Sequence, residues 1–280
     1  MGPAATETGP PHVDVTRHLT QGSHVYQGGG GVGQAHIGVA MSEKQEQTAS
    51  GGRRVLVVMA HPDDVEYNVA GTVARWVDEG AVVTYVLVTD GDKGSSDPTM
   101  VPERLAALRR EEQRAAADVL GVREVVFLGY EDGMVQPTLT LRRDLTRVIR
   151  RYKPDAVICP DPTTRWYAQE YLNHPDHRAV GDTCLDAIYP CARDPLTFPD
   201  LLLEGLQPHE VSEVYLTMTS FADCWVDVSA TMERKLRALR EHRSQIGDGT
   251  EEMVIRWSRE NAKGRDGVDY AEAFKYFRLG

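Results

Sequence analysis

The chain has 280 residues, of which 41% are hydrophobic and 26% are charged, a usage typical of globular proteins. Its formal net charge of −11 at pH 7 repels phosphate backbones, which argues against nucleic acid as a partner. No stretch approaches the ~18 consecutive apolar residues that a membrane span needs. The four cysteines form no C-x-x-C pair, so the sequence indicates neither a zinc ribbon nor a disulfide framework. We therefore expect a protein of the reducing cytoplasm, with no membrane span.

Residues 1–52 differ in character from the rest of the chain. They are rich in glycine and show no sustained hydrophobic periodicity, so they cannot bury enough apolar surface to offset the entropy lost on ordering. We predict a disordered N-terminal tail over 1–52 and one folded domain over 53–280. Met41 resembles a natural start, which leaves open whether the residues before it are native.

From Arg53 onward, two kinds of hydrophobic pattern alternate. Short apolar runs predict strands at 53–60, 81–89, 124–128, 156–159, 214–218 and 225–228. Apolar residues at helical spacing predict helices at 67–79, 102–120, 139–152, 175–188 and 229–244, and in two stretches after Thr250. Strands that alternate with helices predict an α/β domain, with a parallel sheet covered on both faces.

Histidines and carboxylates follow two of the predicted strands. His61 and Asp64 come directly after the first strand, and His174 and His177 lie three residues apart at the start of a predicted helix, on one face. Because sites in open parallel sheets form at the carboxyl ends of strands, we expect these side chains to converge. Two histidines and one carboxylate suit a catalytic zinc, and the same set could hold Fe(II).

Each of these clusters, taken alone, has an ordinary structural explanation. A loop histidine is usually solvated, Asp63-Asp64 could form a turn or a helix cap, and Asp176 could be a carboxylate favoured at a helix start. The expected convergence of both clusters at one edge of the sheet favours a functional site.

Two motifs carry a resemblance to a known family. The segments Ala60–Asp64 (AHPDD) and His174–His177 (HPDH) resemble those of the PIG-L/LmbE-like zinc-dependent N-deacetylases. The resemblance runs from about Arg53 to the end of the chain and includes Arg109-x-x-Glu112. It implies a Rossmann-like, mostly parallel sheet in a single domain.

The resemblance also implies a metal site and a reaction. His61, Asp64 and His177 would hold one Zn²⁺, with Asp63 as the general base for a metal-activated water that attacks an amide. The enzyme would be a metal-dependent N-deacetylase, a hydrolase of carbon–nitrogen bonds other than peptide bonds. It would remove an acetyl or related acyl group from an amino sugar, such as an N-acetylglucosamine conjugate.

Four further residues receive roles from the same resemblance and its chemistry. His174 would face the substrate carbonyl, and Asp176 could orient His174 and favour its charged form. Arg109 and Asp132 match positions that contact substrate in relatives. The expected partner is a small N-acylated sugar, and a homo-oligomer is left open.

Other functions compete with this one. The letters G-x-G-x-x-G at Gly28, Gly30 and Gly33 would suggest a nucleotide-binding protein, but neither a convincing strand nor a convincing helix flanks them, and the turn after the first strand is not glycine-rich. A non-catalytic or differently specialised metal-binding Rossmann-like protein, or an amidase of thiol-sugar conjugates, stays open. The aromatic segment 165–171 could stack on a sugar or pack as a surface loop.

Overall fold

The fold is known from a computed structural model, which describes residues 52–167, 169 and 171–279. The expected tail, apart from Gly52, lies outside these residues, as does the glycine motif within it. The described residues fall within one compact unit. None of the helices among them combines the length and apolar character that a bilayer crossing requires.

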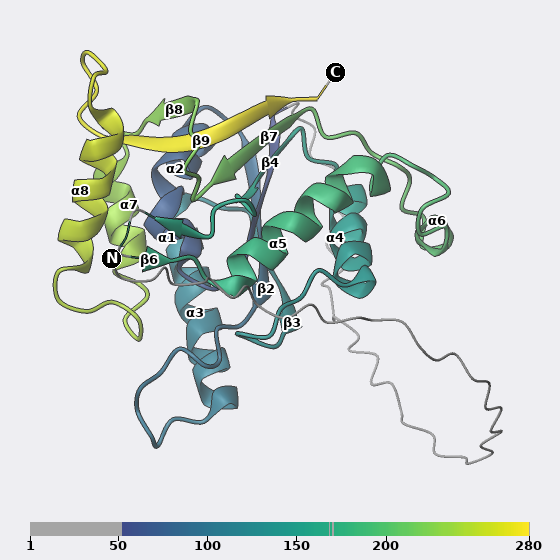
Figure 1. The fold of residues 1–280 in the computed structure, drawn as a ribbon, viewed down its shortest axis with the longest axis horizontal. Helices are drawn as coiled ribbons and strands as arrows, with labels where there is room; N and C mark the ends of the chain where they lie inside the picture. Colours follow the sequence, from purple (N-terminus) through teal and green to yellow (C-terminus); the bar gives the residue numbers. More distant parts are fainter. Residues whose placement is uncertain (1–51, 168, 170, 280) are drawn as a thin grey trace, which may run out of the picture. The chain divides into compact units, whose positions relative to one another are not determined.

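A seven-stranded sheet forms the centre of the domain (Figure 1). Its strand order is β3-β2-β1-β4-β7-β9-β8. The first five strands of this order are mutually parallel, whereas β9 runs antiparallel to both β7 and β8. The strands are β1 (Arg54–Met59), β2 (Val82–Thr89), β3 (Glu124–Tyr130), β4 (Ala156–Pro160), β7 (Glu213–Thr217), β8 (Cys224–Asp227) and β9 (Ala271–Arg278).

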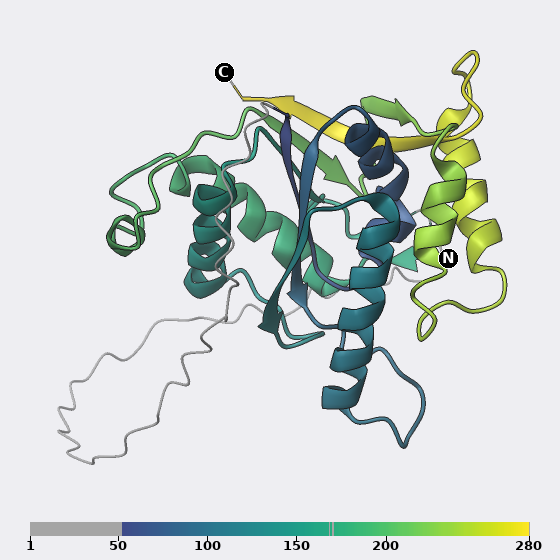
Figure 2. The same cartoon turned by 180° about the vertical axis from the view of Figure 1, so that it is seen from behind.

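Helices cover both faces of this sheet (Figures 1 and 2). Helices α4 and α5 pack together on one face, while α1, α2, α3 and α7 pack on the other. The helices are α1 (Asp64–Asn68), α2 (Ala70–Asp78), α3 (Pro102–Leu120), α4 (Leu139–Tyr152), α5 (Pro175–Asp186), α6 (Asp200–Leu203), α7 (Met232–Leu239) and α8 (Thr250–Ala262). The predicted α/β class, with its mostly parallel sheet, is therefore confirmed.

The apolar runs of the sequence form the middle of the sheet. Val57 of β1 lies opposite Tyr85 of β2 on one side and Ile158 of β4 on the other, and all three are fully buried. Both faces of β1 are covered, which is why its sequence is continuously apolar rather than alternating. The chain therefore leaves the sheet toward His61 from a strand that is buried on both faces.

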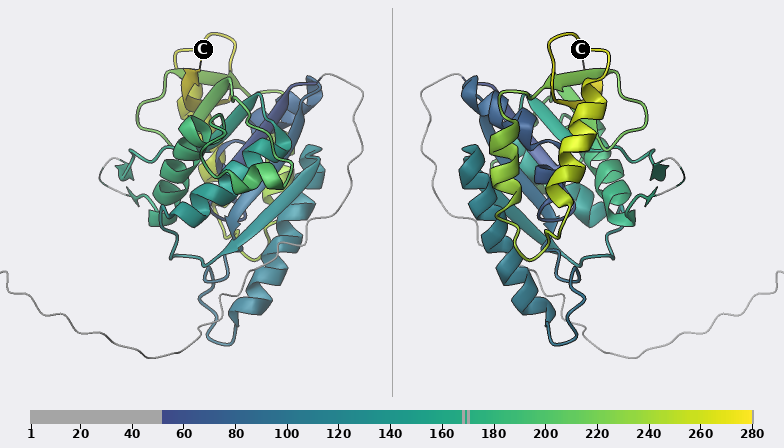
Figure 3. Two further views of the ribbon diagram at one scale, coloured as in Figure 1. Left: turned by 90° about the vertical axis from the view of Figure 1, so that its right-hand side faces the viewer. Right: turned by 90° about the vertical axis from the view of Figure 1, so that its left-hand side faces the viewer.

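Some predicted elements are wrong in type or in extent. The second helix expected after Thr250 is instead strand β9, and the helix expected over 67–79 is two helices, α1 and α2, with non-helical backbone at Val69. A π-helical segment, η1 (Ala187–Cys191), follows α5 and is interrupted by non-helical backbone at Tyr189. The aromatic segment forms a hairpin of β5 (Trp166–Tyr167) and β6 (Tyr171–Leu172), which projects from the body of the domain (Figure 3).

Candidate metal centre and its surroundings

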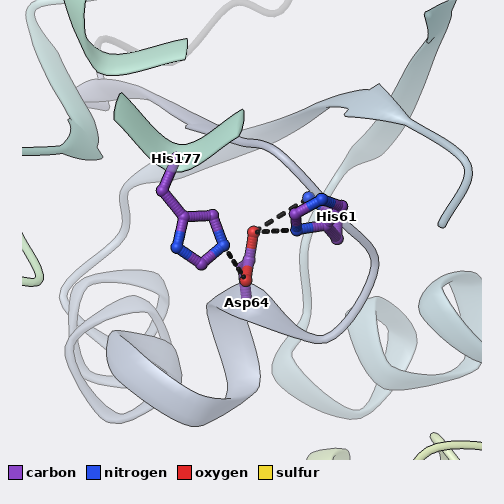
Figure 4. Close-up of side chains that lie close together, drawn as sticks. All are labelled: His61, Asp64 and His177. Atoms are coloured by element: carbon purple, nitrogen blue, oxygen red, sulfur yellow. Dashed lines mark hydrogen bonds and ion pairs between the residues drawn. The ribbon is translucent and has the colours of Figure 1, made fainter. Parts of the chain in front are cut away.

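The two sequence motifs meet at the carboxyl end of the sheet. His61 follows β1, Asp64 begins α1, and His177 lies in the first turn of α5, so three elements converge (Figure 4). One ligand atom from each residue lies within 4.8 Å of the other two. The three side chains are also largely buried, with exposures of 9%, 6% and 8%. This is the ligand set expected from the sequence, brought together by the fold.

His177 shows that the cluster has room for a ligand. Its Nδ1 lies 3.0 Å from Asn173 Oδ1, and because an amide oxygen only accepts, Nδ1 carries the proton. Its Nε2 is buried 3.0 Å from Asp64 Oδ1 and makes no hydrogen bond within the described residues. A histidine that donates one ring N–H to a protein oxygen and turns its other nitrogen toward a cluster of ligand atoms has the usual arrangement of a metal-binding histidine. The residues present therefore fit a divalent metal.

His61 is surrounded by carboxylates. Its Nε2 lies 3.1 Å from Asp132 Oδ1 and 3.3 Å from Asp176 Oδ2, while its Nδ1 lies 3.5 Å from Asp64 Oδ2. Burial opposes the charged imidazolium, but these carboxylates outweigh burial and raise the pKa of His61 well above its usual value. Burial also opposes ionisation of Asp64, but His177 and His61 hold the pKa of this carboxyl well below its usual range. Carboxylates behind the outer nitrogen of a histidine fix its ring, which leaves Nδ1 for a metal.

A second group of side chains could also be considered as a metal site. His61, His174 and Asp176 offer ligand atoms within 4.8 Å of one another. However, Asp176 is fully buried and already accepts hydrogen bonds from the backbone N–H groups of Gly133 (2.7 Å) and Val135 (3.2 Å). Because its oxygens are occupied, the group containing His177 fits a metal better.

His174 occupies the N-cap of α5 rather than a close pair with Asp176. Its Nδ1 accepts a hydrogen bond from the backbone N–H of Asp176 (3.2 Å), and the nearest carboxylate oxygen of Asp176 is 4.0 Å away. Burial and the neighbouring His61 lower the pKa of His174, so the charged form expected from the sequence is disfavoured. A neutral imidazole that accepts at Nδ1 carries its proton on Nε2, where it can donate to a ligand.

Asp63 has an unusual backbone. Its φ of 93° lies in the left-handed region, which a non-glycine residue adopts only where the surroundings hold it there. Its side chain accepts a hydrogen bond from Arg109 Nη2 (3.0 Å), and its backbone N–H donates to Gln113 Oε1 (3.0 Å). Burial raises the pKa of Asp63 to about 6, with Arg109 opposing this shift and Asp64 adding to it. A carboxylate with such a pKa can take a proton near neutral pH and release it again.

The two expected substrate contacts, Arg109 and Asp132, are both buried and both already bonded within the chain. Arg109 donates to Gly91 O (2.8 Å) and Pro62 O (2.5 Å) besides Asp63. Gly91 is needed here, because a Cβ at this position would lie 2.2 Å from the guanidinium. Asp132 accepts from the backbone N–H of Lys93 (3.0 Å) and contacts His61. Their visible role is to hold Asp63 and His61 in place, and their contact with substrate remains a prediction.

Two supporting residues were missed in the sequence. Asn173 fixes His177 and is 3% exposed, and Gln113 holds Asp63 and is fully buried. The position of Asn173, four residues before His177, is a signal that could have identified it, because such residues are often neighbours near a helix start. Nothing local marks Gln113, since its partner lies 50 residues away.

The aromatic hairpin lies beside the site but is only partly anchored. Trp166 is 61% exposed and Tyr171 is 54% exposed, whereas Tyr167 Oη donates to the backbone oxygen of Met218. Tyr167 and Tyr171 lie opposite each other in register, with ring centroids 5.9 Å apart. The segment is thus a hairpin with exposed aromatic rings rather than a packed loop.

Known proteins resemble this chain in sequence and in structure. Residues 56–188 match the family model described as PIG-L, GlcNAc-PI de-N-acetylase. Diacetylchitobiose deacetylase of Thermococcus kodakarensis is 35% identical over 72% of this chain and 73% of its own length. A 1D-myo-inositol 2-acetamido-2-deoxy-alpha-D-glucopyranoside deacetylase of Kribbella flavida is 27% identical, over 69% of this chain and 83% of its own. The solved N,N'-diacetylchitobiose deacetylase of Pyrococcus horikoshii superposes with a TM-score of 0.74 at 33% identity, covering 81% of this chain and 84% of that one.

Proposed function

The chain belongs to the PIG-L family of deacetylases, and on that premise we propose that it hydrolyses the amide of an N-acetylated amino sugar. The reaction consumes one water and yields acetate and the free amine. The observation that carries this proposal is the buried His177 Nε2, which has no hydrogen-bond partner within the described residues. This nitrogen faces Asp64 and His61, and Asp63 directly precedes Asp64 in the chain. A fully satisfied cluster would have no place for a metal or a reacting group.

We propose that His61, Asp64 and His177 hold one divalent metal. Zn²⁺ is the ion most often bound by two histidines and one carboxylate in hydrolases, and Fe²⁺ accepts the same ligands. When bound, such an ion polarises an amide carbonyl and lowers the pKa of water.

The chain's own residues would perform the proton transfers. Asp63, with its raised pKa, takes a proton from the attacking water and delivers it to the departing amine nitrogen. Arg109 holds the Asp63 carboxylate through a 3.0 Å hydrogen bond and so limits its rotation. His174, whose side chain is 38% exposed, donates its Nε2–H to the substrate oxygen on which negative charge develops. Asp176 and Asp132 keep His61 in position from behind.

The relatives indicate which substrates should be tested first. Their names specify a diacetylated chitobiose and an acetamido sugar on inositol, and both carry acetamide on a glucosamine-type ring. We therefore propose an N-acetylglucosamine unit within a larger conjugate as the substrate class. An amidase of thiol-sugar conjugates would cleave a bulkier acyl group at the same nitrogen.

A mass-spectrometric screen tests the proposed function. Zinc-loaded protein is incubated with N,N'-diacetylchitobiose, N-acetylglucosamine and an N-acetylglucosaminyl inositol, and each product is examined for loss of one C₂H₂O unit. Loss of this unit with wild type, but not with Asp63→Asn, is the expected result. If the metal-loaded protein leaves every acetamide intact, deacetylation of this substrate class is refuted. Cleavage of a cysteinyl-glucosamine amide instead would identify the amidase.

A further inference from the structure

Behind Asp63 lies a chain of three fully buried polar side chains that belong to none of the expected site residues. These are Gln113 of α3, Glu66 of α1 and His242 in the connection after α7. We propose that they form a positioning relay, in which the Glu66–His242 pair sets the orientation of the Gln113 amide and Gln113 in turn holds Asp63. The relay depends on the proposed function only in that Asp63 acts on the substrate.

The first link fixes the strained backbone of Asp63. The left-handed φ of Asp63 is unfavourable for a residue with a Cβ and persists only where neighbouring groups hold it. The backbone N–H of Asp63 donates to Gln113 Oε1 at 3.0 Å, and this bond reaches across from α3. This hydrogen bond therefore holds the backbone of Asp63, the residue whose carboxylate must face the substrate.

The second link fixes which way Gln113 points. An amide side chain can present either its oxygen or its NH₂ group, and only the oxygen can accept from Asp63. Gln113 Nε2 donates to both oxygens of Glu66, at 3.1 and 3.2 Å. Because a carboxylate only accepts, it forces the NH₂ group toward itself and the amide oxygen toward Asp63.

The third link balances the buried charge of Glu66. Its Oε2 lies 3.0 Å from His242 Nε2, and both side chains have no exposed surface. Burial lowers the pKa of His242, but the Glu66 carboxylate outweighs burial and the net shift is upward. His242 thus gives the buried Glu66 carboxylate a second partner beside the Gln113 amide and holds the carboxylate in place.

Stability alone does not account for this arrangement. Buried ion pairs are often no more stabilising than well-packed apolar residues of the same volume, so apolar side chains could fill this space. What apolar residues cannot supply is an acceptor for the Asp63 N–H with only one allowed orientation. That requirement explains a carboxylate, an amide and an imidazole in this order.

Counting donors and acceptors yields a test by substitution and rescue. Glu66→Gln replaces one of the two oxygens that face Gln113 Nε2 by an NH₂ group, so a donor meets a donor, that hydrogen bond is lost, and the orientation of the Gln113 amide is no longer enforced. Adding Gln113→Glu restores the full set, because the new amide donates to position 113 and accepts from His242, while the new carboxylate accepts from Asp63. In the single variant the Asp63 backbone amide should lose protection from hydrogen exchange, and in the double variant E66Q/Q113E it should regain that protection.

The primary measurement is residue-resolved hydrogen exchange of the Asp63 amide by NMR. Its reference is the Thr89 amide, which bonds to Ala60 O at 2.9 Å and does not touch the relay. We expect Asp63 to exchange about tenfold faster in Glu66→Gln, consistent with one lost hydrogen bond, while Thr89 is unchanged. The kcat for acetate release should fall about tenfold, with KM within threefold. Both quantities should return to within about threefold of wild type in E66Q/Q113E.

A matched control separates positioning from stability. Glu112 neighbours Gln113 on α3, is 7% exposed, and accepts from Ser244 N and Oγ; it helps to raise the pKa of His242 through its charge but accepts no hydrogen bond from a relay side chain. Glu112→Gln removes the same charge one residue away, so it should lower the melting temperature but leave Asp63 exchange and kcat near wild type. Gln113→Met, which leaves Glu66 paired with His242, provides a second break of the relay if Glu66→Gln does not fold.

Three results would overturn the relay. In the first, Asp63 exchange is unchanged in Glu66→Gln, or in Gln113→Met where Glu66→Gln does not fold. In the second, E66Q/Q113E exchanges as fast as the single variant. In the third, Glu112→Gln speeds hydrogen exchange of the Asp63 amide as much as Glu66→Gln does. Exchange is measured without turnover, so an inactive wild type would refute the proposed function while the hydrogen bonds of the relay are still decided.

Discussion

The buried ion pair of Glu272 and Lys235 differs from the candidate metal centre in how its charged groups are bonded. Beneath the start of α2, Glu272 accepts hydrogen bonds from Gly71 N (2.9 Å), Thr72 N (2.7 Å) and Lys235 Nζ (2.6 Å). Glu272 and Lys235 are 2% and 1% exposed, so every oxygen of the carboxylate is used and the charges balance. This cluster connects β9 and α7 to α2, and both Glu272 oxygens already accept hydrogen bonds.

At the carboxyl end of β1, the buried charged groups are paired differently. Several carboxylates converge on His61 and His177, and His177 Nε2 is left without a hydrogen bond among the described residues. Asp63 beside them is held in a strained conformation. Burial of charge is therefore common to both clusters, whereas an unbonded imidazole nitrogen and a strained backbone distinguish the one that we propose to be catalytic.

The largest expected effect comes from separating Asp63 from its neighbour Asp64. Asp63→Asn keeps the shape of the side chain but cannot accept the water's proton, so turnover should fall about 10²–10⁴-fold while bound metal is retained. Asp64→Asn removes a charged ligand, so it should lose metal as well as activity. Metal content by plasma mass spectrometry, measured beside acetate release, distinguishes the two.

The two aspartates have opposite expected responses to added metal. Excess zinc should partly restore Asp64→Asn and should leave Asp63→Asn inactive. Loss of zinc from Asp63→Asn with retention in Asp64→Asn would reverse the two roles. Near wild-type turnover of metal-loaded Asp63→Asn would mean that another group is the base.

The second expected effect tests the satisfied cluster. Lys235→Met leaves Glu272 as a buried charge without its cation, which should lower the free energy of unfolding by about 3–5 kcal/mol. Turnover per folded molecule should be unchanged, because Lys235 touches neither Asp63 nor the proposed metal ligands. Urea unfolding and acetate release at a temperature where the variant is folded measure both quantities. A specific loss of turnover in folded protein would show that this cluster also serves the reaction.

The difference between these clusters also explains what the sequence could and could not predict. The strands β1, β2 and β4 are continuous apolar runs covered on both faces, so their pattern alone reveals them. Strand β9 places Glu272 inside, where Lys235 pairs with it, so an inward charge disguises the strand. Its aromatic residues, such as Phe274 and Tyr276, favour a strand and could have corrected the prediction.

A similar limit applies to the site. The motifs around His61 and His177 are local, and their expected convergence follows from the edge of the sheet at which parallel strands end. The middle of α3 is crowded with charged residues, yet Arg109, Glu112 and Gln113 are buried there against partners far away in the chain. Composition cannot distinguish a solvated polar face from one that holds a catalytic loop, because the difference depends on tertiary contacts.

The smallest expected effect tests whether Asn173 prepares His177 to bind a metal. The side chain of Asn173 makes two hydrogen bonds, accepting from His177 Nδ1 and donating to Thr164 O at 2.7 Å. Asn173→Ala removes both, whereas Asn173→Asp loses only the donor to Thr164 and keeps the acceptor for His177. Zinc affinity, measured by competition with a chelator, should fall about 10–100-fold in Asn173→Ala and stay near or above wild type in Asn173→Asp, because a carboxylate behind the ring raises its basicity. Equal losses in both variants would assign the effect to the Thr164 bond and the loop it holds, and unchanged affinity in Asn173→Ala would show that His177 needs no partner to bind the metal.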